Sequence, residues 1–182
     1  MQDIKQLLKR RGSLTLSETI DIMLQLTSAV SHAHNSYIIH RDLKPLNIIK
    51  KADGTIVLLD FGLAFVASEN VNLYEIDPTS VACTVQYMAP ELIYHPEGTV
   101  QTDIYALGVS MYEMFTGKCP FNSLDSNDKI SIIKMHQSTE FPSVRKINPS
   151  VTKEFEKQVN KKETIKFFAD NDISFTAKEG EV

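Results

Sequence analysis

Two polar pairs in the middle of the chain, Asp42 with Lys44 and Asn47 with Asp60, have the chemistry needed to move a phosphoryl group. Such a transfer asks a protein mainly to position the reactants and to neutralise charge on the phosphate oxygens. Mg²⁺ prefers hard oxygen ligands and keeps several waters, which the Asp60 carboxylate and the Asn47 amide oxygen satisfy. Asp42 can then accept a hydroxyl proton, while Lys44 offsets charge on the transferring group.

The spacing of the motifs around these residues is more informative than any one motif. Residues 40–47 read H-R-D-L-K-P-L-N, and D-F-G begins at Asp60, 13 residues after Asn47. A-P-E begins at Ala89, 27 residues after Gly62. Each short motif alone is weak, but their occurrence together at these distances leaves little room for coincidence.

Local sequence signals predict the elements that position the motifs. Residues 3–11 are predicted to form a short helix that ends at Gly12. A capping box at Thr15 and Glu18 opens a second helix to about Ser36, with Ser17 as an alternative cap. Its apolar residues fall on two faces, which predicts a largely buried helix. Residues 48–51 and 55–59 predict a hairpin that leaves Asp60 at the end of its second strand.

The second half of the chain has weaker signals. Residues 61–88 show no clean period and contain no Lys or Arg, which predicts a long loop. Thr102 can cap a helix that ends at Gly117, and residues 126–137 also look helical. Ser150 or Thr152 is the predicted start of a last helix. His32 and His34, at the end of the helix before the H-R-D motif, are interpreted as charges that favour a helix C-terminus rather than as metal ligands.

Composition limits the classes of protein that fit. The chain has 182 residues, 42% hydrophobic and 23% charged, with a net charge of −4, which suits one domain or one large lobe. The absence of a basic stripe argues against nucleic acid as a partner. Cys83 and Cys119 make neither a disulfide framework nor a metal cluster. No apolar run is long enough for a membrane segment and the start is polar, so we expect a cytoplasmic chain, a membrane tether elsewhere in a longer parent staying open.

With these motifs in place, the chain resembles the C-terminal large lobe of a eukaryotic-type serine/threonine protein kinase over roughly residues 3–151. The resemblance implies a mainly α, kinase-like fold: a helical bundle with a small β-hairpin that carries the catalytic and metal-binding loops. It implies ATP and Mg²⁺ as cofactors and a protein substrate phosphorylated on Ser or Thr. We expect a kinase-like domain over residues 1–160 and a divergent tail over residues 161–182.

The resemblance also implies individual roles. Asp42 is expected to be the catalytic base and Lys44 the phosphate-facing lysine. Asn47 and Asp60 are expected to hold Mg²⁺ and nucleotide, and Ile49 to form the floor under adenine. Thr84 is expected to bond the catalytic Asp and Lys. His40 and Phe61 are expected to form the lower half of a stacked spine. Asp103 is expected to anchor the catalytic loop from the central helix.

The activation loop carries a further expectation. By the same resemblance Arg41 faces this loop, so a phosphate on Thr79 or Ser80 could pair with it. Both hydroxyls are equally well explained as solvated loop residues.

Three features depart from the family pattern. No G-x-G-x-x-G loop and no strand lysine precede His40. Cys83 stands where the family usually has glycine. Glu91 lacks its usual arginine, because only Arg145 follows it, so we expect it to be exposed or paired otherwise. A lobe without its partner would also leave apolar groups such as Phe61 exposed.

Three interpretations of function therefore stay open. The intact catalytic loop favours a serine/threonine kinase, whose small lobe would come from an upstream reading frame or a second chain. The absence of a glycine-rich loop and a strand lysine to bind the phosphates of ATP favours a non-catalytic kinase-like module that docks substrates or a partner kinase. A truncated gene product is the third. We expect little or no turnover from the isolated polypeptide.

Overall fold

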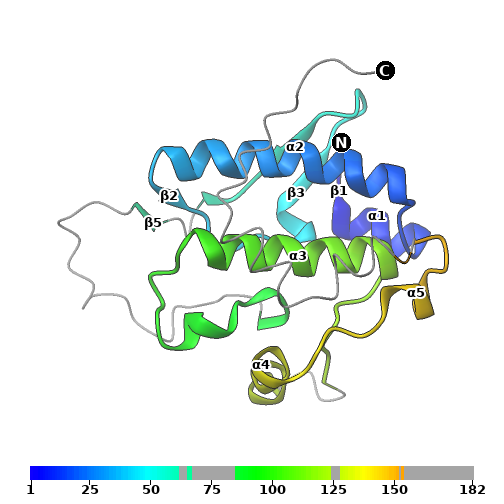
Figure 1. Ribbon diagram of the computed structural model, residues 1–182. Coiled ribbons are helices and arrows are strands. Elements are labelled where there is room, and N and C mark those ends of the chain that lie inside the picture. Colours follow the sequence, from blue (N-terminus) through cyan, green and yellow to red (C-terminus); the bar gives the residue numbers. More distant parts are fainter. Residues whose placement is uncertain (62–64, 67–84, 124–127, 152, 154–182) are drawn as a thin grey trace.

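The computed structural model describes residues 1–61, 65–66, 85–123, 128–151 and 153. Figure 1 shows two long helices, α2 (Leu16–Asn35) and α3 (Val100–Thr116), lying side by side, with the short helix α1 (Ile4–Arg11) near one end of the pair. The helices α4 (Lys129–Ser138) and α5 (Val144–Ile147) lie beyond α3. The expectation of a mainly helical fold with a small antiparallel sheet is confirmed.

The predicted ends of the first two helices are also confirmed. Asp3 caps α1 by accepting from Gln6 N at 2.7 Å, and Gly12 ends the helix with φ 85°. The capping box at Thr15 is complete, because Glu18 N donates to Thr15 Oγ1 at 3.3 Å and Thr15 N donates to Glu18 Oε2 at 3.1 Å. Arg11 adds two bonds to the same carboxylate, at 2.6 and 2.9 Å. These local bonds fix how the chain turns from α1 into α2.

This cap predicts how the stability of the protein depends on pH. Hydrogen bonds, the largest from Arg11, lower the pKa of Glu18 to about 2. Because the pKa is lower in the folded state, the stabilisation is present above the unfolded value of about 4.3 and is lost as pH falls through 2. Glu18→Gln should lower the free energy of unfolding by about 1 kcal/mol at pH 7, since the pair is partly exposed and screened.

Urea unfolding at pH 7 and pH 2.5 measures this effect. The gap between wild type and Glu18→Gln should shrink at the lower pH, whereas Glu140→Gln, at an exposed position, should differ little from wild type at either pH. An equal gap at both pH values for Glu18→Gln would contradict the assignment.

The prediction that α2 is buried on two faces was wrong. Its buried residues form a single stripe toward the core, while Ile20 is 37% and Leu24 is 49% exposed. The members of the stripe are Thr19, Ile22, Leu26, Val30 and Ala33. Helical periodicity places residues on faces, but it cannot tell which faces a neighbouring element covers.

The predicted hairpin is present as β3 (Ile48–Lys50) and β4 (Ile56–Leu58), which pair antiparallel with Ile49 opposite Val57. The sheet has a third strand that the sequence did not indicate: β1 (Gln2–Asp3) pairs with β3, so the order is β1-β3-β4. A second sheet joins β2 (Ile38–Ile39) to β5 (Phe65–Val66). The predicted loop over 61–88 therefore contains a strand, and it ends in the 3₁₀ helix η5 (Val85–Tyr87).

The later helices depart from prediction at their starts. The cap of α3 is Thr99 rather than Thr102, which lies inside the first turn and accepts from Thr99 N at 3.1 Å. Gly117 ends α3 in the left-handed region as predicted. Asp128 caps α4 by accepting from Ser131 N at 3.0 Å, and α5 was not predicted. Ser150 lies in a turn, while Thr152 and residues 154–182, the expected tail included, lie outside the described residues.

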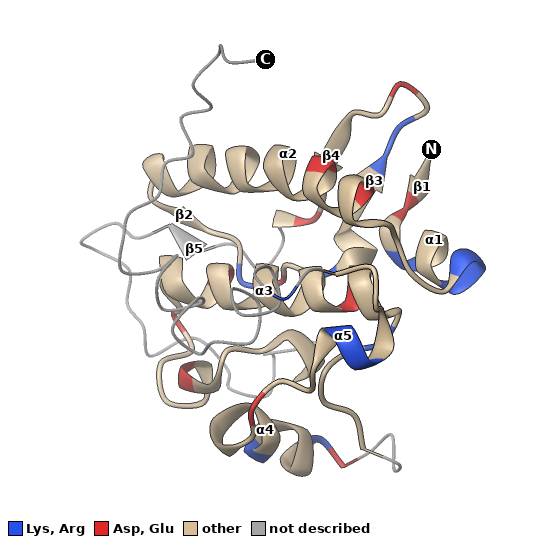
Figure 2. Cartoon of the chain, turned by 45° about the vertical axis from the view of Figure 1, so that its right-hand side comes forward, with Lys and Arg blue, Asp and Glu red and all other residues tan. Residues whose placement is uncertain are grey.

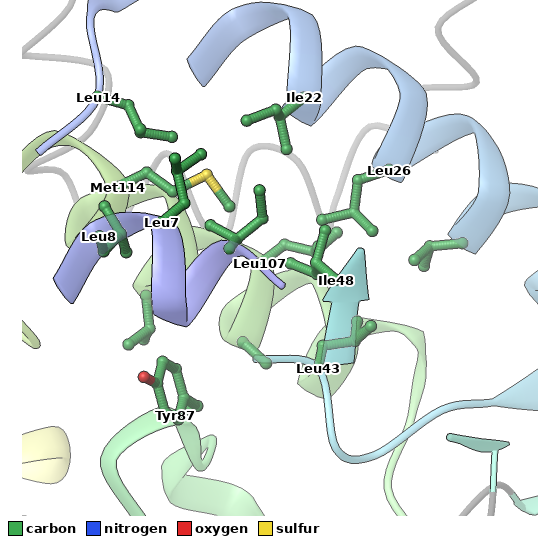
Figure 3. Close-up of a cluster of buried hydrophobic side chains, with 14 residues drawn as sticks. Leu7, Leu8, Leu14, Ile22, Leu26, Leu43, Ile48, Tyr87, Leu107 and Met114 are labelled. Atoms are coloured by element: carbon green, nitrogen blue, oxygen red, sulfur yellow. The ribbon is translucent and has the colours of Figure 1, made fainter. Parts of the chain in front are cut away.

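The core lies between α1, α2, α3 and the start of the hairpin. Figure 3 shows Leu7 beside Met114, and it shows Leu43 and Ile48 near Leu107. Leu43 is 1% and Ile48 0% exposed, so both are full members of this cluster. Burying such side chains stabilises by roughly 2 kcal/mol each. Because Leu43 and Ile48 flank the motif residues 44–47, core packing holds the motif in place.

Within the part of the chain that the structure describes, none of the helices combines the length and apolar character needed to cross a membrane.

Candidate active site

Core packing and a short hydrogen-bonded turn hold the backbone of residues 40–47. Leu43 packs into the core. Pro45 opens the 3₁₀ helix η1 (Pro45–Asn47), and the fixed φ of proline suits the first position of a helix. Asn47 N donates to Lys44 O at 2.9 Å and closes the turn. The short turn brings the side chains of positions 42, 44 and 47 onto one side of the segment.

Three of the six predicted site residues, Asp42, Lys44 and Asn47, share hydrogen bonds. Lys44 Nζ lies 2.6 Å from Asp42 Oδ2, and Asn47 Nδ2 donates to the same oxygen at 3.0 Å and to Asp42 O at 2.9 Å. Asp42 and Asn47 are each only 7% exposed. Both donors bind Oδ2, and no described residue donates to Oδ1, which leaves that oxygen to accept a proton.

Asp60 joins this group through the backbone just before it. Leu59 N donates to Asn47 O at 2.8 Å, and Leu59 O lies 3.1 Å from His40 Nε2. Asp60 itself is exposed and has φ 65°, a conformation that costs energy for a residue with a side chain. The ring of Phe61 contacts that of His40 with centroids 4.7 Å apart and planes tilted by 55°, while the spine role of the pair stays a prediction. The end of β4 is therefore tied to the segment that carries Asp42.

The expectation that Asp103 anchors the catalytic loop is confirmed. His40 N donates to Asp103 Oδ2 and Arg41 N to Oδ1, each at 2.8 Å, and Asp103 is fully buried. A third partner was missed: His34 Nε2 lies 2.8 Å from Oδ2. Nothing local in the sequence distinguishes His34 from the exposed His32, because the contact spans 69 residues.

A second buried carboxylate was missed as well. Glu113, 2% exposed on α3, binds Lys5 Nζ of α1 and accepts from Tyr87 OH of η5. Burial, with the Glu113 charge, raises the pKa of Tyr87 and raises that of the Cys119 thiol to about 11. The raised pKa favours the protonated thiol of Cys119 at neutral pH. Glu113 connects α1, α3 and η5.

Charges on the described surface are mixed. Figure 2 shows Lys and Arg on the last turn of α1 and on α5, with Asp and Glu distributed among the other elements. No group of three His, Cys, Asp or Glu residues in the described part of the chain is arranged to hold a metal. A Mg²⁺ ion held by one carboxylate, one amide oxygen and waters needs no such cluster.

Comparison with known proteins decides the family. The family model described as protein kinase domain matches residues 1–175. The chain belongs to the protein kinase family. It is 37% identical over 153 residues to the serine/threonine-protein kinase PrkC of Bacillus subtilis, which covers 84% of this chain and 23% of that protein. It is 32% identical over 181 residues to the serine/threonine-protein kinase PknH of Mycobacterium tuberculosis, 97% of this chain and 28% of the relative.

These relatives place the protein kinase chain among the serine/threonine kinases by homology. The chain spans about a quarter of the length of the two relatives. Protein kinases use ATP and Mg²⁺ and act on protein substrates.

The donors of this kinase chain fit a magnesium ion. Asn47 uses its amide nitrogen for both bonds to Asp42, which leaves the amide oxygen as the group for a cation. A neutral amide oxygen and a carboxylate are ligands that Mg²⁺ accepts, and the backbone bond from Leu59 N to Asn47 O brings the segment of Asp60 to that of Asn47. Asn47 and Asp60 would hold the ion.

The structure does not test most of the other roles that the resemblance implied for individual residues. Ile49 is half-buried on β3, and its role under adenine stays a prediction. Thr84, Thr79, Ser80 and Cys83 lie outside the described residues, so their roles stay predictions too. Arg41 Nη1 donates to Pro96 O at 3.1 Å, a contact that the sequence did not suggest.

Glu91 was expected to lack its usual arginine partner, and that expectation stays a prediction. It is half-buried and accepts backbone bonds from Tyr94 and His95 through its own carbonyl. Its charge, after burial, contributes to raising the pKa of Tyr105. Arg145 instead donates from Nε to Val151 O at 3.1 Å.

Proposed function

We propose that residues 1–160 are the large lobe of a serine/threonine protein kinase that transfers the γ-phosphate of ATP to Ser or Thr hydroxyls of a protein substrate. The observation that carries the proposal is the pairing of Asp42 Oδ2 with both Lys44 Nζ and Asn47 Nδ2. Two donors on one oxygen fix the carboxylate, and they direct the other oxygen toward an incoming hydroxyl. Residues 161–182 are proposed to be a tail.

Each side chain then has one task. Asp42 Oδ1 accepts the proton of the attacking hydroxyl and orients its oxygen. Lys44, 2.6 Å from Asp42 Oδ2, places a positive charge beside the group in transfer. Asn47 and Asp60 hold Mg²⁺, which when bound neutralises charge on the phosphate oxygens. Ile49 lies under the adenine, and Thr84 bonds Asp42 and Lys44.

Transfer needs a second surface that grips the phosphates of ATP. The 182 residues contain no G-x-G-x-x-G loop, so this surface would come from another part of the polypeptide or from another chain. Two apolar side chains beside the site support a covering partner, because Leu59 is 40% and Phe61 is 44% exposed. The same two residues favour, as a second candidate function, a non-catalytic module that docks a partner kinase.

A lysine substitution tests the proposal. Lys44→Met, measured in the whole protein, should lower the initial rate of ³²P transfer from Mg-ATP to myelin basic protein by about 100-fold, because one positive charge is lost beside the transferring group. Lys51→Met removes an exposed lysine from the hairpin turn and should leave the rate unchanged.

The outcomes separate the two candidate functions. Equal rates for wild type and Lys44→Met would contradict the assigned role of the lysine. A wild-type protein that incorporates no phosphate, yet binds a partner kinase through a surface that Phe61→Asp disrupts, would favour the docking module.

A further inference from the structure

Helix α2 has an apolar stripe that the described part of the chain leaves partly exposed. Leu16, Ile20 and Leu24 recur every four residues, so they lie on one face of the helix, beside the stripe that faces the core. Leu16 is half-buried, whereas Ile20 is 37% and Leu24 is 49% exposed. Apolar side chains exposed in a row, rather than singly, indicate a surface that another segment covers.

One end of this stripe lies where the described chain ends. Val151 is 1% exposed, and the buried cluster to which it belongs has Leu16 as a partly buried neighbour. Lys153 is the last residue that the structure describes. The chain therefore leaves the core beside the first residue of the stripe, and the residues that follow start from that point.

The following residues are long enough to reach the other end of the stripe. At 1.5 Å per helical residue, Leu16 and Leu24 are about 12 Å apart along α2. An extended chain from residue 153 to residue 165 can span up to about 40 Å. Residues from 165 onward can therefore lie on Ile20 and Leu24 without any change in the described structure.

Residues 165–175 have a composition that favours packing against an apolar surface. They read I-K-F-F-A-D-N-D-I-S-F, with five large apolar side chains in this short segment. Residues 176–182 read T-A-K-E-G-E-V and contain no aromatic residue. Because burial of apolar area is the main favourable term in association, residues 165–175 are the part of the tail suited to cover the stripe.

A hollow beside Leu24 adds a charge that this segment complements. The hollow lies between α2 and the turn of the β3–β4 hairpin, has a volume of about 550 Å³, and is lined by Leu24, Asp21, Asp53 and Lys50 among others. Gln25 fixes its two walls together, because Gln25 Nε2 donates to Gly54 O at 3.3 Å and Ile56 N donates to Gln25 Oε1 at 3.0 Å. Two carboxylates against one ammonium group make the hollow acidic, which suits a segment that carries a lysine among apolar residues.

We propose that residues 165–175 of this same chain dock along α2, with their apolar side chains on Ile20 and Leu24 and with Lys166 beside the carboxylates of Asp21 and Asp53. The stripe and the hollow are then one intramolecular interaction surface. Because this surface includes the hairpin turn, the docked segment holds the hairpin against α2. The proposal does not depend on phosphoryl transfer, and none of its tests uses activity.

Reaction of an introduced thiol tests whether the segment covers α2. In the full chain, Leu24→Cys should react with iodoacetamide about 10-fold faster or more when Phe168→Asp is added, because a covered thiol reacts only when the segment is released. Ile130→Cys replaces a 66% exposed residue of α4, and its rate should change by less than about 3-fold with the same addition. Mass spectrometry of the labelled peptides separates these thiols from Cys83 and Cys119.

A matched pair of lysine variants tests the charge pairing. Lys166→Glu should accelerate the labelling of Leu24→Cys by about 3-fold or more, because it replaces attraction to the acidic hollow by repulsion. Lys178→Glu makes the same change of charge outside residues 165–175 and should leave the labelling rate unchanged. Equal effects of the two lysine variants would contradict the placement of Lys166 at the hollow.

Two outcomes of the labelling would overturn the proposal. The first is an equal rate for Leu24→Cys with and without Phe168→Asp. The second is a rate for Leu24→Cys that falls as the protein concentration rises and that Phe168→Asp does not change, because a second copy of the chain then covers the stripe.

Hydrogen exchange of the unmodified protein covers the case in which a variant does not fold. The amides of residues 165–175 should exchange about 10-fold more slowly or less in the full chain than in a synthetic peptide of the same sequence. Exchange at the rate of the free peptide would overturn the proposal. If the segment is protected while the wild type transfers no phosphate, the proposed function fails and the docking surface stands.

Discussion

Replacing Asp42 by asparagine is expected to lower the rate of phosphoryl transfer by about 1,000-fold, the largest effect on activity of any single substitution in the site. Asparagine has nearly the same shape as aspartate, so it can keep a bond from Lys44 or Asn47 to its remaining oxygen. It cannot accept a proton at neutral pH. The variant therefore removes the chemical function at position 42 while changing the packing of a 7% exposed residue very little.

The measurement is the initial rate of ³²P transfer from Mg-ATP in the whole protein, with the far-UV circular dichroism and melting temperature of each variant. Asp53→Asn is the matched control, because Asp53 lies in the exposed hairpin turn, where it accepts from Thr55 N at 3.0 Å. That variant should transfer phosphate at the wild-type rate. An Asp42→Asn protein with wild-type activity would refute the assignment of Asp42 as the base.

The second large effect concerns stability. Gly117 ends α3 with φ 73°, and a Cβ at this position would lie 1.9 Å from the carbonyl oxygen of Gly12, which ends α1. The clash is between the new Cβ and the backbone of Gly12, so no side-chain rotation can relieve it. Gly117→Ala should lower the free energy of unfolding by about 3 kcal/mol or more, as the sum of left-handed strain and displacement of one helix end.

Gly54→Ala separates these two contributions. Gly54 has φ 88°, but a Cβ there would meet nothing within 4 Å, so only the backbone strain of roughly 1 kcal/mol applies. Urea unfolding of both variants measures the difference. Thermal midpoints should fall by roughly 6–12 °C for Gly117→Ala and by roughly 2–4 °C for Gly54→Ala. Equal losses in the two variants would show that the contact of Gly117 with Gly12 adds nothing.

The parts of the fold that the sequence predicted correctly are those fixed by local signals. The capping box of Thr15 and Glu18 and the hairpin turn at Gly54 each lie within a few residues, so their physics can be read without knowing what packs above them. The wrong or missing elements depend on distant partners. The two-residue strands β1 and β5 exist because β3 and β2 pair with them, and the exposed face of α2 depends on which neighbours cover it.

The same distinction applies to the site. Motif spacing located Asp42, Lys44 and Asn47, because a single short turn brings them together. His34 and Lys5 carried no such signal, since their carboxylate partners are 69 and 108 residues away. In a sequence, a histidine or lysine on a helix cannot be distinguished from a solvent-exposed charge, because its buried acidic partner is known only from the tertiary structure. The chemistry was therefore predictable, while the residues that hold it in position were not.

The contact between Lys5 and Glu113 also has a consequence for synthesis of the protein. Helix α1 bonds a carboxylate that is translated 108 residues after Lys5. At a translation rate of about 5–20 residues per second, Met114 and the end of α3 are synthesised roughly 5–20 s after α1. During that time the apolar side of α1 has no core to pack against. Until then the nascent chain exposes Leu7 and Leu8, which makes the interval of translation itself the period in which this lobe is most open to chaperones and to aggregation.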